Sequence, residues 1–72
     1  MVINNEEYTP GHYAVFVFQG DWKIGKILPT PEYDIKRNII RLSTSETDYV
    51  NRNVEYVKKL TMEEMVEYTL GQ

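Results

Sequence analysis

Cysteine is absent from this 72-residue chain, and histidine occurs only once, at His12. Without cysteine there is neither a disulfide nor a thiolate ligand, and a single histidine does not make a metal-binding cluster. A nucleophile also needs a base placed against it, and one histidine after a turn glycine does not indicate such a pair. We therefore expect no metal, no cofactor and no catalytic residue, and the sequence predicts a protein that is not an enzyme.

Long apolar runs and a basic N-terminal region are also missing. The longest apolar run covers residues 13–18, which is far too short to cross a bilayer. Glu6 and Glu7 stand near the N-terminus, where a signal peptide would carry basic residues. These features predict one domain over residues 1–72, located in the cytoplasm and without a membrane partner.

The charge is spread unevenly along the chain, which has a net charge of −3. Residues 1–10 and 61–72 carry only acidic charged side chains, whereas residues 11–60 hold eight basic and six acidic ones. The acidic ends argue against non-specific binding of nucleic acid, but the basic centre leaves room for a local basic groove.

Short stretches of β-branched and aromatic residues, separated by turn signals, indicate strands. Five strands are expected, at residues 13–19, 22–28, 38–43, 47–50 and 54–57. Gly20 lies in a tight hairpin loop, and Gly25, inside the second strand, indicates a sharp bend or a close backbone approach. Residues 29–34 are expected to form a loop, because Pro29 and Pro31 interrupt strand pairing.

The first predicted strand is apolar on both faces. Tyr13, Val15 and Val17 share one face, and Ala14, Phe16 and Phe18 share the other. Such a strand is expected to be buried on both sides, or to be covered on one side by a helix. If the helix leaves the second face open, a second subunit must cover it, which would make the protein a homo-oligomer.

The C-terminal segment predicts a helix over about residues 62–70. Thr61 is followed three residues later by Glu64, which is the spacing of a capping box, and Gly71 stands where a C-cap glycine belongs. Apolar residues recur at helical spacing at Met62, Met65, Val66 and Leu70. We expect this stripe to pack as core rather than to serve as an adaptable binding surface.

Closely spaced short strands predict a mainly β fold, a small five-stranded barrel over about residues 12–60 with the C-terminal helix appended. Trp22, then Gly25 three positions later and Ile27 two further, resemble the second-strand signature of Tudor domains, a family of SH3-like barrels. The resemblance implies a binding module, often with an aromatic cage for methylated lysine or arginine. Residues 43–46 depart from it, since many Tudor domains carry an acidic-aromatic-glycine-asparagine tetrad there.

Other segments are similar to the Sm-like RNA-binding proteins, which are also SH3-like barrels. Residues 34–38 resemble that family's Asp-x-x-x-Asn loop, where the family holds a base. Residues 53–57 are similar to the end of its second motif, although Val50-Asn51 occupies the place of the expected Arg-Gly pair. This second resemblance implies RNA binding.

Aromatic residues are the candidates for a partner site. Trp22, Tyr33 and Tyr49, with Asp21 beside the first of them, would anchor a partner if the three rings gather at one mouth of the barrel. The other interpretation is that each ring covers the core separately. We expect a non-catalytic interaction module, a small regulatory or inhibitory protein that binds a larger protein partner.

A set of basic and polar residues gives the alternative function. Its members are Lys36, Arg37, Asn38 and Arg52. Together with aromatic rings they would bind RNA or single-stranded DNA through stacking and phosphate contacts. They would equally suit a solvated strand face, so both interpretations stay open.

Overall fold

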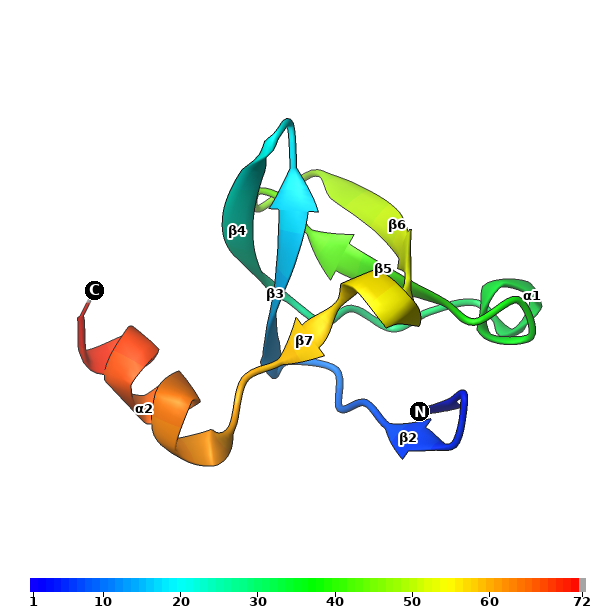
Figure 1. The fold of residues 1–72 in the computed structure, drawn as a ribbon, viewed down its shortest axis with the longest axis horizontal. Helices are drawn as coiled ribbons and strands as arrows, with labels where there is room; N and C mark the ends of the chain where they lie inside the picture. The colour runs from blue at the N-terminus through cyan, green and yellow to red at the C-terminus, as the bar shows by residue number, and fades with distance from the viewer. Residues whose placement is uncertain (72) are drawn as a thin grey trace.

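The computed structural model describes residues 1–71 (Figure 1). Its strands are β1 Val2–Ile3, β2 Glu6–Glu7, β3 Tyr13–Phe18, β4 Asp21–Lys26, β5 Ile39–Ser43, β6 Tyr49–Asn53 and β7 Lys58–Lys59. The helical elements are α1 Glu32–Ile35, the 3-10 helix η1 Val54–Tyr56, and α2 Met62–Leu70. The chain is therefore mainly β with a short C-terminal helix, as the sequence predicts.

The strands form three open antiparallel sheets. β1 pairs with β2, β3 lies between β4 and β7, and β5 pairs with β6. An isolated bridge between Ile27 and Leu42 joins the second sheet to the third. The expected five-stranded barrel is not confirmed: the structure has seven strands, the β3–β7 ladder spans two residue pairs, and the continuation of β4 meets β5 at this bridge.

An N-terminal hairpin, which the sequence analysis did not predict, contributes to the core. Asn4 and Asn5 have positive φ values of 52° and 66°, which is the conformation of a type I′ turn. The turn brings β1 against β2, and both Ile3 and Tyr8 join the buried cluster. Strands of two residues are too short to show alternation, so the Asn-Asn pair is the sequence signal for this hairpin.

The chain around β6 differs from the prediction of two short strands. β6 runs without a break through residues 51–53, and the segment that follows it is η1 rather than a strand. The Asn53 side chain accepts a hydrogen bond from Glu55 N–H at 3.0 Å and so caps the 3-10 turn. Val54 and Val57 are three residues apart, which matches the repeat of a 3-10 helix better than that of a strand.

A short helix, α1, replaces part of the predicted loop at residues 29–34. Pro31 precedes it, and the Pro31 carbonyl accepts hydrogen bonds from Asp34 and Ile35 N–H at 3.0 and 3.1 Å. Proline interrupts a strand, but its fixed φ, here −61°, suits the start of a helix. The two prolines were correct signals that strand pairing ends, but they also allowed a helical turn.

One apolar cluster with members from all three sheets forms the core. It consists of Ile3, Tyr8, Ala14, Phe16, Ile27, Ile40, Leu42 and Val54. Gly25 of β4 lies opposite Ala14, and a Cβ atom at Gly25 would collide with the Ser43 carbonyl oxygen and lie 2.8 Å from the Phe16 ring. The predicted close approach of the backbone at this glycine is confirmed.

Helix α2 has the bounds that the sequence predicts. Thr61 Oγ1 accepts a hydrogen bond from Glu64 N–H at 3.1 Å, and Glu64 Oε1 accepts one from Thr61 N–H at 2.9 Å, which completes the capping box. The bond from the Thr61 backbone lowers the pKa of the Glu64 carboxyl group. Within residues 1–71, neither helix is long and apolar enough to cross a membrane.

Candidate functional site

The β3–β4 hairpin positions Trp22 beside one face of β3. Gln19 and Gly20 have positive φ values of 53° and 80°, so a two-residue type I′ turn joins the strands. The register pairs Val17 with Trp22, and residues opposite each other on neighbouring strands point to the same face. The Trp22 N–H donates to Asp21 Oδ1 at 2.9 Å, which fixes the backbone where the turn ends.

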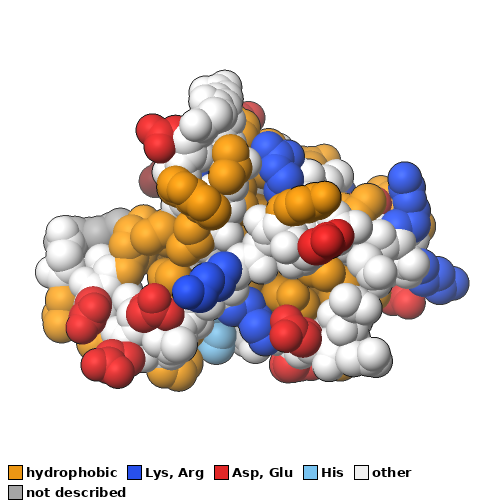
Figure 2. All heavy atoms as spheres, viewed as in Figure 1, with side chains coloured by type: hydrophobic (Ala, Val, Ile, Leu, Met, Phe, Trp, Pro, Cys, Tyr) orange, Lys and Arg blue, Asp and Glu red, His pale blue; other side chains and the backbone are white. Residues whose placement is uncertain are grey.

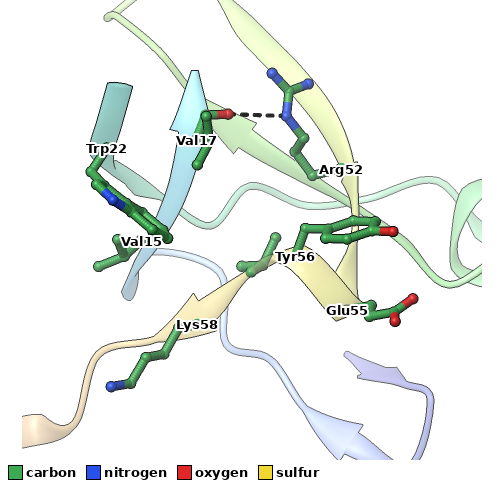
Figure 3. Close-up of a pocket in the computed structure, with 8 residues that line it drawn as sticks. Val15, Val17, Trp22, Arg52, Glu55, Tyr56 and Lys58 are labelled. Atoms are coloured by element: carbon green, nitrogen blue, oxygen red, sulfur yellow. Dashed lines mark hydrogen bonds between the residues drawn. The ribbon is translucent and has the colours of Figure 1, made fainter. Parts of the chain in front are cut away.

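A groove of about 580 Å³ lies between this face of β3 and the segment from β6 to β7 (Figure 3). We call it the Trp22 groove; it is lined by Val15, Val17, Trp22, Arg52, Glu55, Tyr56, Val57 and Lys58. In Figure 3, Trp22 stands with the two valines of β3 on one side, and Arg52 and Tyr56 stand on the other. The groove therefore separates two aromatic rings that come from distant parts of the sequence.

The groove exists because β7 is short. Within the described chain, β7 pairs with Ala14 and Val15 of β3 and not with Val17. Arg52 reaches across the resulting gap, where its Nε donates to the Val17 carbonyl at 3.3 Å and its Nη1 donates to the Asn51 carbonyl at 2.9 Å. A side chain thus takes the position in which a longer β7 would have bonded to the edge of β3.

The two aromatic rings of the groove are largely exposed. Trp22 is 71% exposed and Tyr56 is 69% exposed. Figure 2 shows hydrophobic side chains at the surface over β4 and toward α2. Contiguous exposed apolar surface on a small domain is characteristic of an interaction site, because it is costly to leave in water.

The charges around the groove favour an anionic ligand. Arg52 and Lys58 supply two positive charges, and Glu55 supplies one negative charge. The chain as a whole has a net charge of −3, so this excess of positive charge is local. Apolar walls reduce screening by water and strengthen the attraction of such cations for a carboxylate or a phosphate.

The three aromatic residues proposed from the sequence do not line one groove. Trp22 does, whereas Tyr33 lies exposed on α1 and the ring of Tyr49 lies 4.2 Å beneath the Arg41 guanidinium. Among residues 1–71, the second ring of the groove belongs to Tyr56, which the sequence analysis did not single out. The sequence signal for its outward position is the three-residue spacing of Val54 and Val57, which fits a 3-10 turn that leaves the Tyr56 ring exposed.

The basic candidates lie at two different places. Lys36, Arg37 and Asn38 follow α1 and are exposed, and Asn38 adopts a positive φ of 60°. Arg52 lies in the Trp22 groove and is held there by its bond to Val17. The four residues therefore do not line the same groove, and Arg52 groups with the aromatic candidates.

Asp34, the first residue of the segment that resembles the Sm-like loop, is buried. Its Oδ2 lies 3.8 Å from Arg41 Nη2, and the same guanidinium stacks on Tyr49. Within residues 1–71, neither Asp34 Oδ2 nor Arg41 Nε has a hydrogen-bond partner. This carboxylate faces an internal arginine, so its position does not suit the capture of a base from solvent.

Helix α2 covers only one end of the outer face of β3. The Tyr13 N–H points to Met65 Sδ at 3.4 Å, and the rings of Tyr13 and Tyr68 lie 5.2 Å apart. Val15 and Val17, farther along β3, line the groove instead. Of the covers expected for this face, α2 therefore supplies only the part at Tyr13, because the nine-residue helix reaches no farther. Cover of the half at Val15 and Val17 by a second subunit stays a prediction.

The apolar residues of α2 are not core, contrary to the sequence prediction. None of the residues Met62–Leu70 is buried, and the outward side carries a series of apolar side chains one turn apart. We call Met62, Val66 and Leu70 the outer stripe of α2; they are 66%, 54% and 80% exposed. The strands already fill the core. Helix α2 lies against the sheet at its edge, where Met65 and Tyr68 contact Tyr13.

Comparison of the chain with protein-family models, with curated proteins and with solved structures found no match.

Proposed function

We propose that this protein is a non-catalytic interaction module, a small regulatory or inhibitory protein that binds a larger protein in the Trp22 groove. The observation that carries the proposal is the pair of exposed rings, Trp22 and Tyr56, on opposite sides of an open apolar groove. Buried tryptophan and tyrosine anchors at the centre of an interface each contribute about 2 kcal/mol or more to binding.

The charge of the groove narrows the chemistry of the partner. Arg52 and Lys58 would repel a methylated lysine or arginine, so the aromatic-cage ligand implied by the Tudor resemblance is disfavoured here. We expect a protein segment that inserts one bulky apolar side chain between the rings and presents an Asp or Glu carboxylate to the two cations.

The SH3-like barrel is part of the same proposal. The order β7-β3-β4, continued through the Ile27–Leu42 bridge to β5 and β6, is the strand sequence that a rolled sheet of this kind would have. In such a roll the Trp22 groove would lie where β3 and the segment before β7 move apart. The fold alone does not determine what is bound, so the proposed function depends on the groove.

A peptide-display selection tests the proposal. A library of random peptides is selected on the wild-type protein alone, and the selected peptides are then titrated against the wild type and its variants. We expect peptides with an apolar residue next to Asp or Glu, which bind Trp22→Ala and Tyr56→Ala about tenfold or more weakly. Tyr33→Ala is the matched control, because Tyr33 is equally exposed but lies on α1, and it should change affinity less than about twofold.

A second titration, with a labelled oligonucleotide, tests the nucleic-acid alternative. A labelled uridine oligonucleotide would bind tightly at low salt, lose affinity steeply as salt rises, and lose it again in Lys36→Glu/Arg37→Glu. The protein-binding proposal predicts weak binding of this probe. For the selected peptides it predicts a shallower loss of affinity with salt, because they pair with two cations and not with a row of basic residues. Selected peptides that bind Trp22→Ala as well as they bind the wild type would overturn it.

A further inference from the structure

The chain carries two apolar surfaces that residues 1–71 leave largely exposed. One is the Trp22 groove, and the other is the outer stripe of α2. Met62, Val66 and Leu70 are spaced four residues apart, so their side chains form one continuous ridge along the helix. A ridge of this kind is the usual form in which a helix fills an apolar groove.

The charges of the two surfaces are complementary. α2 carries three glutamates and no basic residue, and Glu63 and Glu67 adjoin the outer stripe at helical spacing. The groove, by contrast, presents Arg52 and Lys58. A helix seated with its apolar ridge in the groove would bring carboxylates close to these two cations.

The helix of the same chain cannot make this contact without losing its own anchorage. Only Leu60 and Thr61 separate β7 from α2, and α2 is held against Tyr13 through Met65 and Tyr68. Pairing of the outer stripe with the outer stripe of another copy would bring the Glu63 and Glu67 carboxylates of the two helices together, which is unfavourable. The groove of a second copy is therefore the favoured acceptor for the stripe.

We infer that two copies of this chain form a reciprocal dimer in which each α2 places Met62, Val66 and Leu70 in the Trp22 groove of the other copy. The inference rests on the proposed function, since it treats the groove as a protein-binding surface. A two-fold axis makes both contacts equivalent and leaves neither apolar surface open. Dimerisation and partner binding then compete for the groove, so the concentration of the protein regulates its availability.

Charge reversal tests the inference through the mass of the particle in solution. Light scattering of the wild type should show twice the 8.5 kDa chain mass at high micromolar concentration. One variant, Arg52→Glu/Lys58→Glu, makes the groove acidic, and a second, Glu63→Lys/Glu67→Lys, makes the helix basic. Each variant alone places like charges in both contacts, so its dimer should dissociate about tenfold or more readily.

Mixing the two variants restores opposite charges in both contacts, and the mixture should form a heterodimer of wild-type strength. Circular dichroism of each variant establishes that it is folded. Tyr33→Ala should dimerise normally, and Trp22→Ala and Val66→Asp should be monomers. A monomeric wild type, a folded mixture that stays monomeric, or a dimer that survives both Trp22→Ala and Val66→Asp would overturn the inference.

The two proposals fail in distinguishable ways. A wild type that stays monomeric but still selects Trp22-dependent peptides keeps the interaction module and removes the dimer. The opposite result is a dimer that depends on Trp22 and Val66, in a protein that selects no peptide even when it is dilute. That result would support the dimer and contradict the proposed external partner.

Discussion

The two faces of β3 carry similar apolar side chains but differ in what covers them. Phe16, on the inner face, is 0% exposed, whereas Val17, the next residue along the strand, is 45% exposed. Phe16 packs in one cluster with Ile3 of the N-terminal hairpin and Leu42 of β5. On the outer face, α2 reaches Tyr13 and stops short of Val17.

This difference shows that an apolar pattern identifies the surfaces that need a partner but not the partner itself. Both faces of β3 would lower the free energy of the chain if they were buried. One is buried within the chain, so it supports stability, and the other is left for another molecule, so it supports binding. Substitutions on the two faces should therefore affect different measurements.

The largest effect is expected at the centre of the inner face. Phe16→Ala should lower the free energy of unfolding by about 3–5 kcal/mol, because it leaves a cavity among the buried side chains. Val17→Ala should lower it by less than about 1 kcal/mol, since Val17 is already partly in water. Urea unfolding followed by circular dichroism measures both.

Phe16→Ala alone could unfold so small a domain, so Phe16→Leu supplies a graded measurement with an expected cost of about 1.5 kcal/mol. Equal costs for Phe16→Ala and Val17→Ala would show that the two faces do not differ as described.

A smaller loss of stability is expected where β4 approaches the inner face. Gly25→Ala would place a methyl group against the Ser43 carbonyl oxygen and the Phe16 ring, and overpacking against backbone costs about 3 kcal/mol. Gly20→Ala is the matched control, because nothing lies within 4 Å of a Cβ atom there and only its φ of +80° is strained. That strain costs about 1 kcal/mol. Denaturant midpoints show which variant loses more stability. A larger loss for Gly20→Ala than for Gly25→Ala would contradict the close approach of the backbone at Gly25.

The contribution of Tyr8, next to the N-terminal hairpin, to stability can be distinguished from that of the other core residues by its dependence on pH. Burial, and the hydrogen bond that the Tyr8 hydroxyl donates to Glu6 at 3.1 Å, raise the pKa of Tyr8 from 10.0 to about 12. As pH rises through 10, the unfolded tyrosine loses its proton before the folded one does, so ionisation favours unfolding.

Wild type should therefore exceed Tyr8→Phe in stability by a constant amount, about 1 kcal/mol, below pH 10. That advantage should shrink as the pH rises above 10 and change sign before pH 12, because a two-unit rise in the pKa corresponds to more than about 1 kcal/mol. Unfolding experiments on both proteins measure it. A difference independent of pH would mean that Tyr8 titrates normally in the folded chain.

The sequence was sufficient for elements defined by neighbouring residues. The capping box of Thr61 and Glu64 predicts the start of α2, and the glycine turn predicts the β3–β4 hairpin, because in both cases the stabilising contacts lie within a few residues. Gly25 was likewise correctly interpreted as a close backbone approach. Trp22 and Arg52, which the sequence analysis selected for different ligands, line the same groove; their roles in binding stay predictions.

The groove itself could not be predicted, because its shape depends on contacts between distant segments. It opens where β7 ends, and its second ring, Tyr56, is directed by the Asn53 cap of η1. The sequence analysis interpreted residues 54–57 as a strand, and a strand there would have placed Tyr56 differently. The outer stripe of α2 was taken for core for a related reason: periodicity shows that a helix has an apolar face but not whether the chain has room to bury it.

The smallest effect on stability, and the one that best isolates the outer face, is expected for Val17→Thr. This change keeps the branched shape at a partly exposed position, so the free energy of unfolding should change by less than about 0.5 kcal/mol. The groove, however, gains a hydroxyl group that a bound apolar side chain would leave without a hydrogen bond, which costs about 1 kcal/mol, or about fivefold in affinity. Titration with the selected peptides measures this loss, and the dissociation constant of the dimer should rise in parallel.

Val2→Thr is the matched control, because Val2 is also exposed but lies in β1 outside the groove. Equal affinities for Val17→Thr and Val2→Thr would mean that ligands do not reach the outer face of β3.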